Sequence, residues 1–162
     1  MPVDVLAPGV PMLFMGEGFR VHATSETTRG GFLIAEIASR PGGGPLDLHS
    51  HVAAEQYMCL EGTITVITDE GVYRLGPFDS VTISPWLGHT YRNLGDVPAR
   101  LVCTLSPPHD MEAFLREVCE PLGDPAAPLP EVTREQSDWA MEVAGRHGMR
   151  ILGPYDPAVL GG

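Results

Sequence analysis

The stretch with the clearest potential for chemistry lies between residues 43 and 62. His49 and His51 are two positions apart, and on a β-strand such residues leave the same face, about 6.5 Å apart at a rise of about 3.3 Å per residue. Glu55 follows four positions later and can add a carboxylate oxygen if the chain bends between them. Two imidazoles and a carboxylate on one side of a strand can hold a single metal ion from that side.

A third histidine lies in a second stretch, residues 78–93, where a β-like run and a Pro/Gly turn precede another strand. His89 opens that strand. Three imidazoles and one carboxylate form a set of nitrogen and oxygen donors that suits one divalent Fe, Mn, Ni, Cu or Zn ion and suits Ca or Mg poorly. The alternative is a group of unrelated polar residues near strand ends, which would explain a lone His-x-His pair. The joint pattern favours the metal.

The first stretch resembles a motif of the cupin superfamily. It has the spacing Gly-x5-His-x-His-x3-Glu-x6-Gly and matches the first cupin motif at every fixed position: Gly43, His49, His51, Glu55 and Gly62. The resemblance covers about residues 28–106. It implies an all-β fold, a double-stranded β-helix or jelly-roll barrel. It also implies one metal ion inside the barrel, bound by His49, His51, Glu55 and His89.

The second cupin motif is matched in its latter part and departs from the pattern before it. His89 and Asn93 have the expected spacing. Phe78 stands where a glycine usually precedes the aspartate, Pro85 sits one residue late, and Trp86 stands where the turn glycine is expected. These changes affect the shape of loops and leave the candidate ligand positions intact.

Composition limits the classes of function. The chain has 162 residues, which suits one domain, and 19 glycines with 16 prolines favour strands and turns. A net charge of −11 argues against binding to nucleic acid or to anionic membranes. All ten basic residues are arginine, so lysine Schiff-base chemistry is excluded. The three cysteines predict reduced thiols, and without a visible signal peptide or membrane span we expect a cytoplasmic protein.

The rest of the first 109 residues is predicted to form the barrel and an N-terminal arm. Residues 1–18 are expected to be an irregular arm or edge strand. Glu36 is predicted to pair with an arginine, and Arg92 to point away from His89 onto the surface. Further strands are predicted at residues 19–24, 32–39, 63–68, 72–75 and 100–105, with a hairpin turn at 69–71.

Residues 110–162 are predicted to form a short α-helical C-terminal extension that packs on the barrel or on a partner subunit. Asp110 is predicted to cap a first helix with an apolar stripe. Thr133 and Gln136 form a capping box that opens a second helix, with Trp139 expected on its apolar side. A helical tail of this kind resembles small quercetin-dioxygenase-like cupins, and the family resemblance implies a homodimer.

The expected chemistry is metal-assisted, and the candidate catalytic residues are Glu55, Tyr57 and Tyr91. In quercetin-dioxygenase-like cupins the matching glutamate is thought both to bind metal and to act as a base, so the resemblance implies this for Glu55. Strand alternation places Tyr57 on the face of Glu55, and Tyr91 on the face of His89. Each tyrosine can donate a proton or simply fill the barrel, and packing is favoured.

Three functions compete at this point. The first is a dioxygenase-like enzyme acting on a small aromatic or enol-type molecule, such as a flavonol or a polyketide. The second is a non-oxidative cyclase, isomerase or lyase that uses the metal as a Lewis acid. The third is a non-catalytic protein that binds a small molecule. Trp86, at the expected barrel mouth, suits a lid over the substrate or plain packing equally well.

Overall fold

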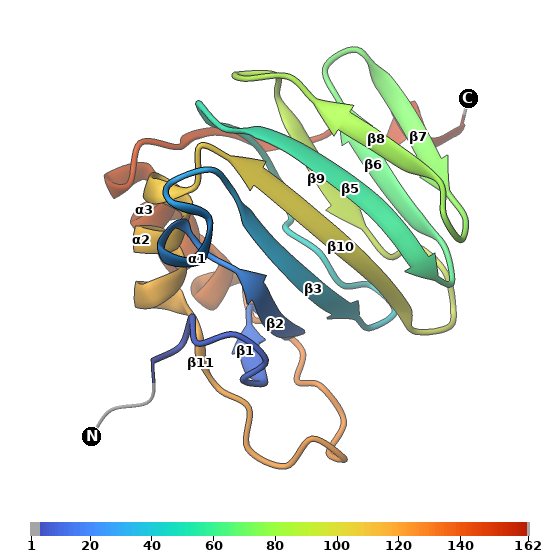
Figure 1. The fold of residues 1–162 in the computed structure, drawn as a ribbon. Coiled ribbons are helices and arrows are strands. Elements are labelled where there is room, and N and C mark those ends of the chain that lie inside the picture. Colours follow the sequence, from blue (N-terminus) through green and yellow to red (C-terminus); the bar gives the residue numbers. More distant parts are fainter. Residues whose placement is uncertain (1–3, 162) are drawn as a thin grey trace.

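A computed structural model describes residues 4–161 as two antiparallel β-sheets packed face to face (Figure 1). Residues 1–3 of the expected N-terminal arm lie outside the described part. The larger sheet has seven strands, in the order β11 (Glu120–Pro121), β1 (Met12–Phe14), β2 (Glu17–Ala23), β3 (Leu33–Ser39), β10 (Ala99–Ser106), β5 (Ala54–Glu61) and β8 (Ser80–Ile83).

The second sheet and the helices complete the predicted architecture. Its five strands are β12 (Arg150–Pro154), β4 (Asp47–Ser50), β9 (His89–Arg92), β6 (Ile64–Thr68) and β7 (Gly71–Leu75), in that order. The helices are α1 (Ser25–Thr28), α2 (His109–Val118), α3 (Arg134–Arg146) and the short 3-10 helix η1 (Pro157–Gly161). The all-β jelly-roll prediction is confirmed. In the part of the chain that is described, no helix is long and apolar enough to cross a membrane.

Alternation along the strands places the core between the sheets. In β3 the odd positions Leu33, Ala35 and Ile37 are buried, because their side chains leave the inner face. Glu36 lies on the opposite face, where its Oε1 accepts a hydrogen bond from Arg100 Nη2 at 2.7 Å, as predicted. The pairing of β10 with β5 sets Leu105 opposite Glu55 and brings Cys103 opposite Tyr57. The inner face of the larger sheet therefore places Glu55 and Tyr57 among the apolar side chains of the core.

The C-terminal extension closes one end of the barrel (Figure 1). Helices α2 and α3 lie together at the end where β3 begins and β10 ends. The chain then returns as β12, which pairs antiparallel with β4 and sets Ile151 opposite His49. This strand was not predicted, because Gly153 and Pro154 are typical of chain ends and loops.

The helix boundaries confirm one predicted cap and correct another. The capping box of α3 is present, with Gln136 N donating to Thr133 Oγ1 at 3.1 Å. Asp110 does not cap α2. That helix begins at His109, after Pro108, so Asp110 lies in its first turn. Trp139 is 48% exposed and therefore lies off the buried stripe of α3.

Arg92 was predicted to lie on the surface and is buried. Its Nη2 donates a hydrogen bond of 2.8 Å to the carbonyl of Gly42. The prediction failed because it placed the outer face of β9 in solvent, whereas the loop before β4 crosses that face. Gly44 shows how tight the crossing is: its φ is +101°, and a Cβ there would overlap the carbonyl of Tyr91.

The two residues that replace motif glycines keep the glycine backbone. Phe78 has φ 68° and Trp86 has φ 65°. Each follows a proline and occupies the third position of a turn closed by a hydrogen bond, from Asp79 N to the Gly76 carbonyl at 3.0 Å and from Leu87 N to the Ser84 carbonyl at 3.2 Å. Such turns favour proline at the second position and glycine at the third. The turns keep their shape because proline favours the backbone conformation at their second position. The strain falls on Phe78 and Trp86, which adopt a left-handed backbone.

We predict that Phe78→Gly stabilises the protein. Phe78 is 78% exposed, so little packing is lost, while the left-handed backbone costs an L-residue about 1–2 kcal/mol. Part of this gain is offset by the greater freedom of glycine in the unfolded chain, which leaves a net gain of about 0.5–1 kcal/mol in the free energy of unfolding by urea. Phe32→Gly, at an exposed phenylalanine without a left-handed backbone, should be destabilising. Equal losses in both variants would contradict the strain argument.

Candidate metal centre

The structure brings the three predicted histidines together inside the barrel. His49 lies in β4, His51 just beyond its end, and His89 at the start of β9, directly opposite His49 in the ladder. One ring nitrogen from each lies within 4.8 Å of the others, and all three side chains are buried. The spacing suits a single ion, so this group could hold a metal.

Backbone carbonyls orient the three rings. Each Nδ1 lies within hydrogen-bonding distance of a carbonyl two residues away: His49 with Asp47 at 3.3 Å, His51 with Ala53 at 2.9 Å and His89 with Leu87 at 2.8 Å. A carbonyl oxygen only accepts, so Nδ1 must be the protonated nitrogen in each ring. The other nitrogen, Nε2, is then left to act as a ligand.

Glu55 lies against two of these rings. Its Oε2 is 3.1 Å from Nε2 of His51 and 3.1 Å from Nε2 of His89. A neutral ring protonated on Nδ1 presents a lone pair at Nε2, and a carboxylate also presents lone pairs. Two such contacts in a buried place require a cation between the groups, either a proton on the ring or a metal ion shared by all of them.

The electrostatics of the cluster agree with this requirement. Burial opposes the charge of Glu55, but hydrogen bonds from His51 and His89 outweigh burial and hold its pKa well below the ordinary value. Burial lowers the pKa of His51, but the hydrogen bond and the negative charge of Glu55 have the larger effect. The pKa of His51 is therefore raised above its ordinary value. Burial and the neighbouring His89 lower the pKa of His49 to about 3, so the His49 ring is neutral at neutral pH and could bind a metal.

Tyr57, Tyr91 and Cys103 form the layer beneath the cluster. The ring centroids of Tyr57 and His89 are 6.2 Å apart, and those of the two tyrosines 5.5 Å apart. Burial raises the pKa of all three groups well above their ordinary values, so they keep their protons. The hydroxyl of Tyr91 has no hydrogen-bond partner among the described residues. Cys103 was not singled out from the sequence, because its place depends on the register between β10 and β5.

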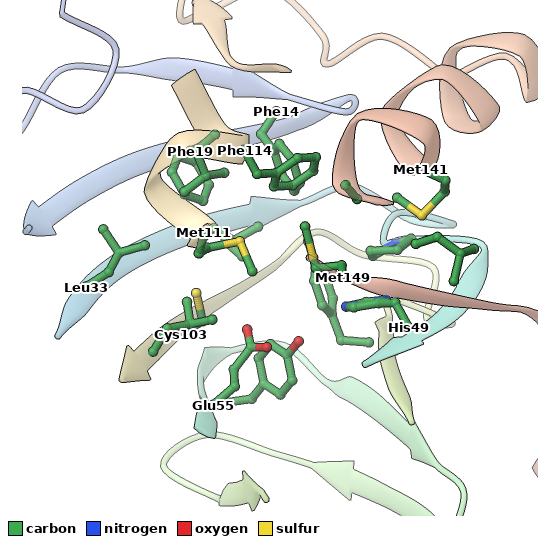
Figure 2. A pocket seen from close by; sticks show the side chains of 18 residues that line it. Phe14, Phe19, Leu33, His49, Glu55, Cys103, Met111, Phe114, Met141 and Met149 are labelled. Atoms are coloured by element: carbon green, nitrogen blue, oxygen red, sulfur yellow. The ribbon is translucent and has the colours of Figure 1, made fainter. Parts of the chain in front are cut away.

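His49 and Glu55 form one end of a cavity of about 60 Å³ (Figure 2). His49, Glu55 and both tyrosines belong to its lining. The opposite wall is apolar and comes from β1, β2, α2, α3 and β12, with Met111, Met141 and Met149 facing the polar end. Sequence reasoning missed this wall, since a helical stripe indicates burial but not the surface that covers it.

Two other candidates from the sequence have structural roles. Asn93 orders the loop after β9, because its Nδ2 donates to the carbonyls of Ser39 at 3.1 Å and Val97 at 2.9 Å. Trp86 is outside the cavity lining and packs under Arg150, whose guanidinium carbon is 4.2 Å from the ring centroid. Packing, and not a lid over the cavity, is therefore its role in this structure.

Glu17 is another buried acid and lies against the loop before β4. Glu17 is 1% exposed, and its Oε1 accepts a hydrogen bond from Gly44 N at 3.0 Å, while no partner for Oε2 is found among the residues described. Burial raises the pKa of Glu17 to about 7. A Cβ at Gly43 would overlap Glu17 Oε1, which explains why the motif position is a glycine.

Comparisons with known proteins agree with the fold. Residues 36–105 match the Cupin_2 family, a cupin domain. The barrel has a cupin fold. The match ends before α2, so the cupin domain does not include the helical wall of the cavity. An uncharacterised protein from Methanocaldococcus jannaschii is 32% identical over 73 residues, which cover 44% of this chain and 58% of that protein. This chain thus spans less than two thirds of that relative.

Solved cupin structures superpose on the barrel. An RmlC-like cupin from Shewanella frigidimarina has a TM-score of 0.54 at 17% identity, over 62% of this chain and 86% of that one. A cupin-2 domain from Rhodospirillum rubrum has a TM-score of 0.53 at 23% identity, covering 65% and 74%. A predicted oxalate decarboxylase from Thermotoga maritima has a TM-score of 0.53 at 18% identity, covering 65% and 97%. At these identities the likeness shows the fold alone.

We predict that the purified protein binds about one first-row transition metal ion per chain and that His49→Ala or His89→Ala abolishes this binding. The metal content per chain is measured by elemental analysis after reconstitution and desalting. His22→Ala is the matched control, because this histidine has a side chain 46% exposed and bonds Glu36 outside the barrel. Full metal content in the His49 and His89 variants would contradict the site.

We predict that Glu17→Gln flattens the dependence of stability on pH. A carboxyl whose pKa rises from 4.5 to about 7 on folding stabilises the protein fully below pH 4.5, and this contribution is lost as the pH rises through 7. The loss amounts to roughly 3 kcal/mol for this buried group. Relative to wild type, the variant should therefore gain stability between pH 5 and pH 8 in urea unfolding. The exposed Glu70→Gln should change nothing, and parallel curves for wild type and Glu17→Gln would refute the prediction.

Proposed function

We propose that this cupin-fold protein is a metal-dependent, dioxygenase-like enzyme that acts on a small enol or 1,3-dicarbonyl compound of the flavonol or polyketide type. The observation that carries the proposal is a cavity with His49 of the three-histidine group and Glu55 at one end, and apolar side chains over most of the rest. The resemblance of the histidine motif and helical tail to quercetin-dioxygenase-like cupins adds support.

In this proposal the histidines and Glu55 bind the metal, and Glu55 also transfers the proton. A metal held by His49, His51, Glu55 and His89 would polarise the oxygens of the substrate and activate it towards dioxygen. Glu55 is ionised and buried, and it takes the acidic proton of the enol or of the carbon between two carbonyls. The apolar lining offers the charged groups little solvation from protein dipoles and so strengthens each of these charge interactions.

The two tyrosines would serve as neutral hydrogen-bond donors. Their raised pKa values keep both hydroxyls protonated at any physiological pH. The hydroxyl of Tyr91 has no partner among the described residues, and a buried donor without a partner is costly. A substrate oxygen in the cavity would remove that cost, which favours Tyr91 as the donor that orients the substrate.

A non-oxidative cyclase, isomerase or lyase is the second candidate. It is favoured by the same pairing of an ionised carboxylate with protonated phenols, which can take a proton at one substrate atom and return it at another. Such chemistry needs only a Lewis acid and no dioxygen, so it would continue without air and with zinc. A third candidate, non-catalytic binding, would show ligand retention without product.

We predict that the iron-loaded protein consumes dioxygen in the presence of a flavonol or a 1,3-diketone, and that Tyr91→Phe lowers kcat by about 10–100-fold with little change in metal content. An oxygen electrode and product analysis by mass spectrometry measure both effects. Tyr73→Phe is the matched control, because Tyr73 lies in β7 and is 41% exposed.

Two outcomes separate the candidates. Turnover of the same substrates under nitrogen, with zinc in the protein, would replace the oxidative proposal by the second candidate. Absence of oxygen uptake and of product with every metal tested would reject both enzymatic proposals. Equal kcat for wild type and Tyr91→Phe would remove the assigned role of Tyr91.

A further inference from the structure

The cavity has two chemically different halves (Figure 2). The barrel strands supply the polar end, where the carboxylate of Glu55 points into the space next to His49. The other half is built by the N-terminal strands and the C-terminal extension, including the aromatic group of Phe14, Phe19 and Phe114. Much of this second half lies outside residues 36–105, the segment that matches the cupin family.

The methionine wall, consisting of Met111, Met141 and Met149, is the part of the apolar half that the C-terminal extension supplies. Met111 comes from α2, Met141 from α3, and Met149 from the turn that leads to β12. In Figure 2 the side chains of Met111 and Met149 lie between the phenylalanines and the polar end, and Met141 lies on α3, above His49 in the view. A ligand in this cavity that places one end next to His49 and Glu55 therefore has these thioethers close to its other end.

Charge in the lining restricts that other end. The chain contains no lysine, and no arginine belongs to the described residues that line the cavity. The formal charge near the ligand comes from Glu55, which is an anion. A second carboxylate or phosphate on the ligand would be buried without a cation to pair with it, which is strongly unfavourable.

Size is restricted less rigidly than charge. A volume of about 60 Å³ holds only a few water molecules, at roughly 10–15 Å³ for each. A ligand with an aromatic ring therefore requires side chains of the wall to move. Methionine is unbranched and adapts its shape readily, and Met111 and Met141 are only partly buried, so these two can shift.

We propose that the methionine wall is the specificity element of this site: it admits ligands with one chelating oxygen end and an uncharged apolar body, rejects ligands with an additional anionic group, and sets the size of the body. This inference rests on the proposed function for the chelating end. It concerns residues of the C-terminal extension, and it distinguishes the site from ones built for sugar phosphates or small dicarboxylates.

The test is calorimetric titration with three 1,3-diketones that share a chelating end: acetylacetone, benzoylacetone and benzoylacetone with a carboxylate at the para position of its ring. The full-length protein is used with zinc and without metal, under nitrogen, so that binding is measured without oxidation. We expect the carboxylate to weaken binding at least about tenfold relative to benzoylacetone in both metal states. Met141→Ala should raise the affinity ratio of benzoylacetone to acetylacetone at least about threefold, because it enlarges the space for the ring.

Matched variants keep the result interpretable. Met58→Ala removes a partly buried methionine of β5 that is outside the cavity lining, and should leave the ratio within about twofold. Met111→Ala repeats the test from α2 if the α3 variant does not fold. Three results would overturn the inference. The first is equal affinity for benzoylacetone and its para-carboxylate, and the second is no binding of any diketone. The third is a benzoylacetone-to-acetylacetone affinity ratio in both wall variants that equals the ratio in Met58→Ala.

The inference and the proposed function fail in different experiments. Selective binding of the uncharged diketones without any product would support the specificity element and count against an enzyme. Turnover that uses the para-carboxylate as readily as benzoylacetone would support an enzyme and overturn the specificity element.

Discussion

The contact between Glu55 and two histidine rings is the interaction on which the interior of this barrel depends. Carbonyls at Asp47, Ala53 and Leu87 fix the Nδ1 proton of each ring, so the Nε2 lone pairs must face inward. A buried carboxylate facing such lone pairs is unfavourable until a cation lies between them. Strands from both sheets are needed for this arrangement, since His49 and His89 belong to one sheet and Glu55 to the other. The site is therefore a consequence of how the two sheets face each other.

The C-terminal extension covers the apolar side of this polar cluster. Strand β12 continues the smaller sheet beside β4 and so supports the backbone on either side of His49. Helices α2 and α3 cover the end of the barrel and add an apolar wall opposite the cluster. In this chain the barrel holds a group of histidines that could bind a metal, and the extension supplies most of the apolar side chains that face it. Differences in such extensions are a simple physical reason why one barrel can serve many activities.

Much of the barrel could be predicted because its signals are local. His49 and His51 share a face by strand alternation alone, and the hairpin at residues 69–71 and the capping box at Thr133 follow from residue type. The motif spacing carried the jelly-roll prediction, although Phe78 and Trp86 replace glycines, because the prolines before them preserve the turns.

What could not be predicted depends on contacts between distant segments. Arg92 lies on the outer face of its strand, and only the crossing of the loop at Gly42 buries it. Cys103 reaches the cavity through the register of two strands, and the methionines through the packing of helices against the barrel. Strand β12 forms by pairing with β4, although Gly153 and Pro154 locally predict a loop. Each of these depends on tertiary structure that a single sequence does not encode locally.

The most direct test of the central claim is X-ray absorption at the metal K-edge of the reconstituted protein. If three Nε2 atoms and Glu55 share one cation, the spectrum should show nitrogen and oxygen neighbours at about 2.0–2.2 Å and the multiple-scattering pattern of about three imidazoles. That pattern should lose one imidazole in His89→Ala. A spectrum without imidazole scattering, or one that is the same in wild type and the variant, would contradict the account.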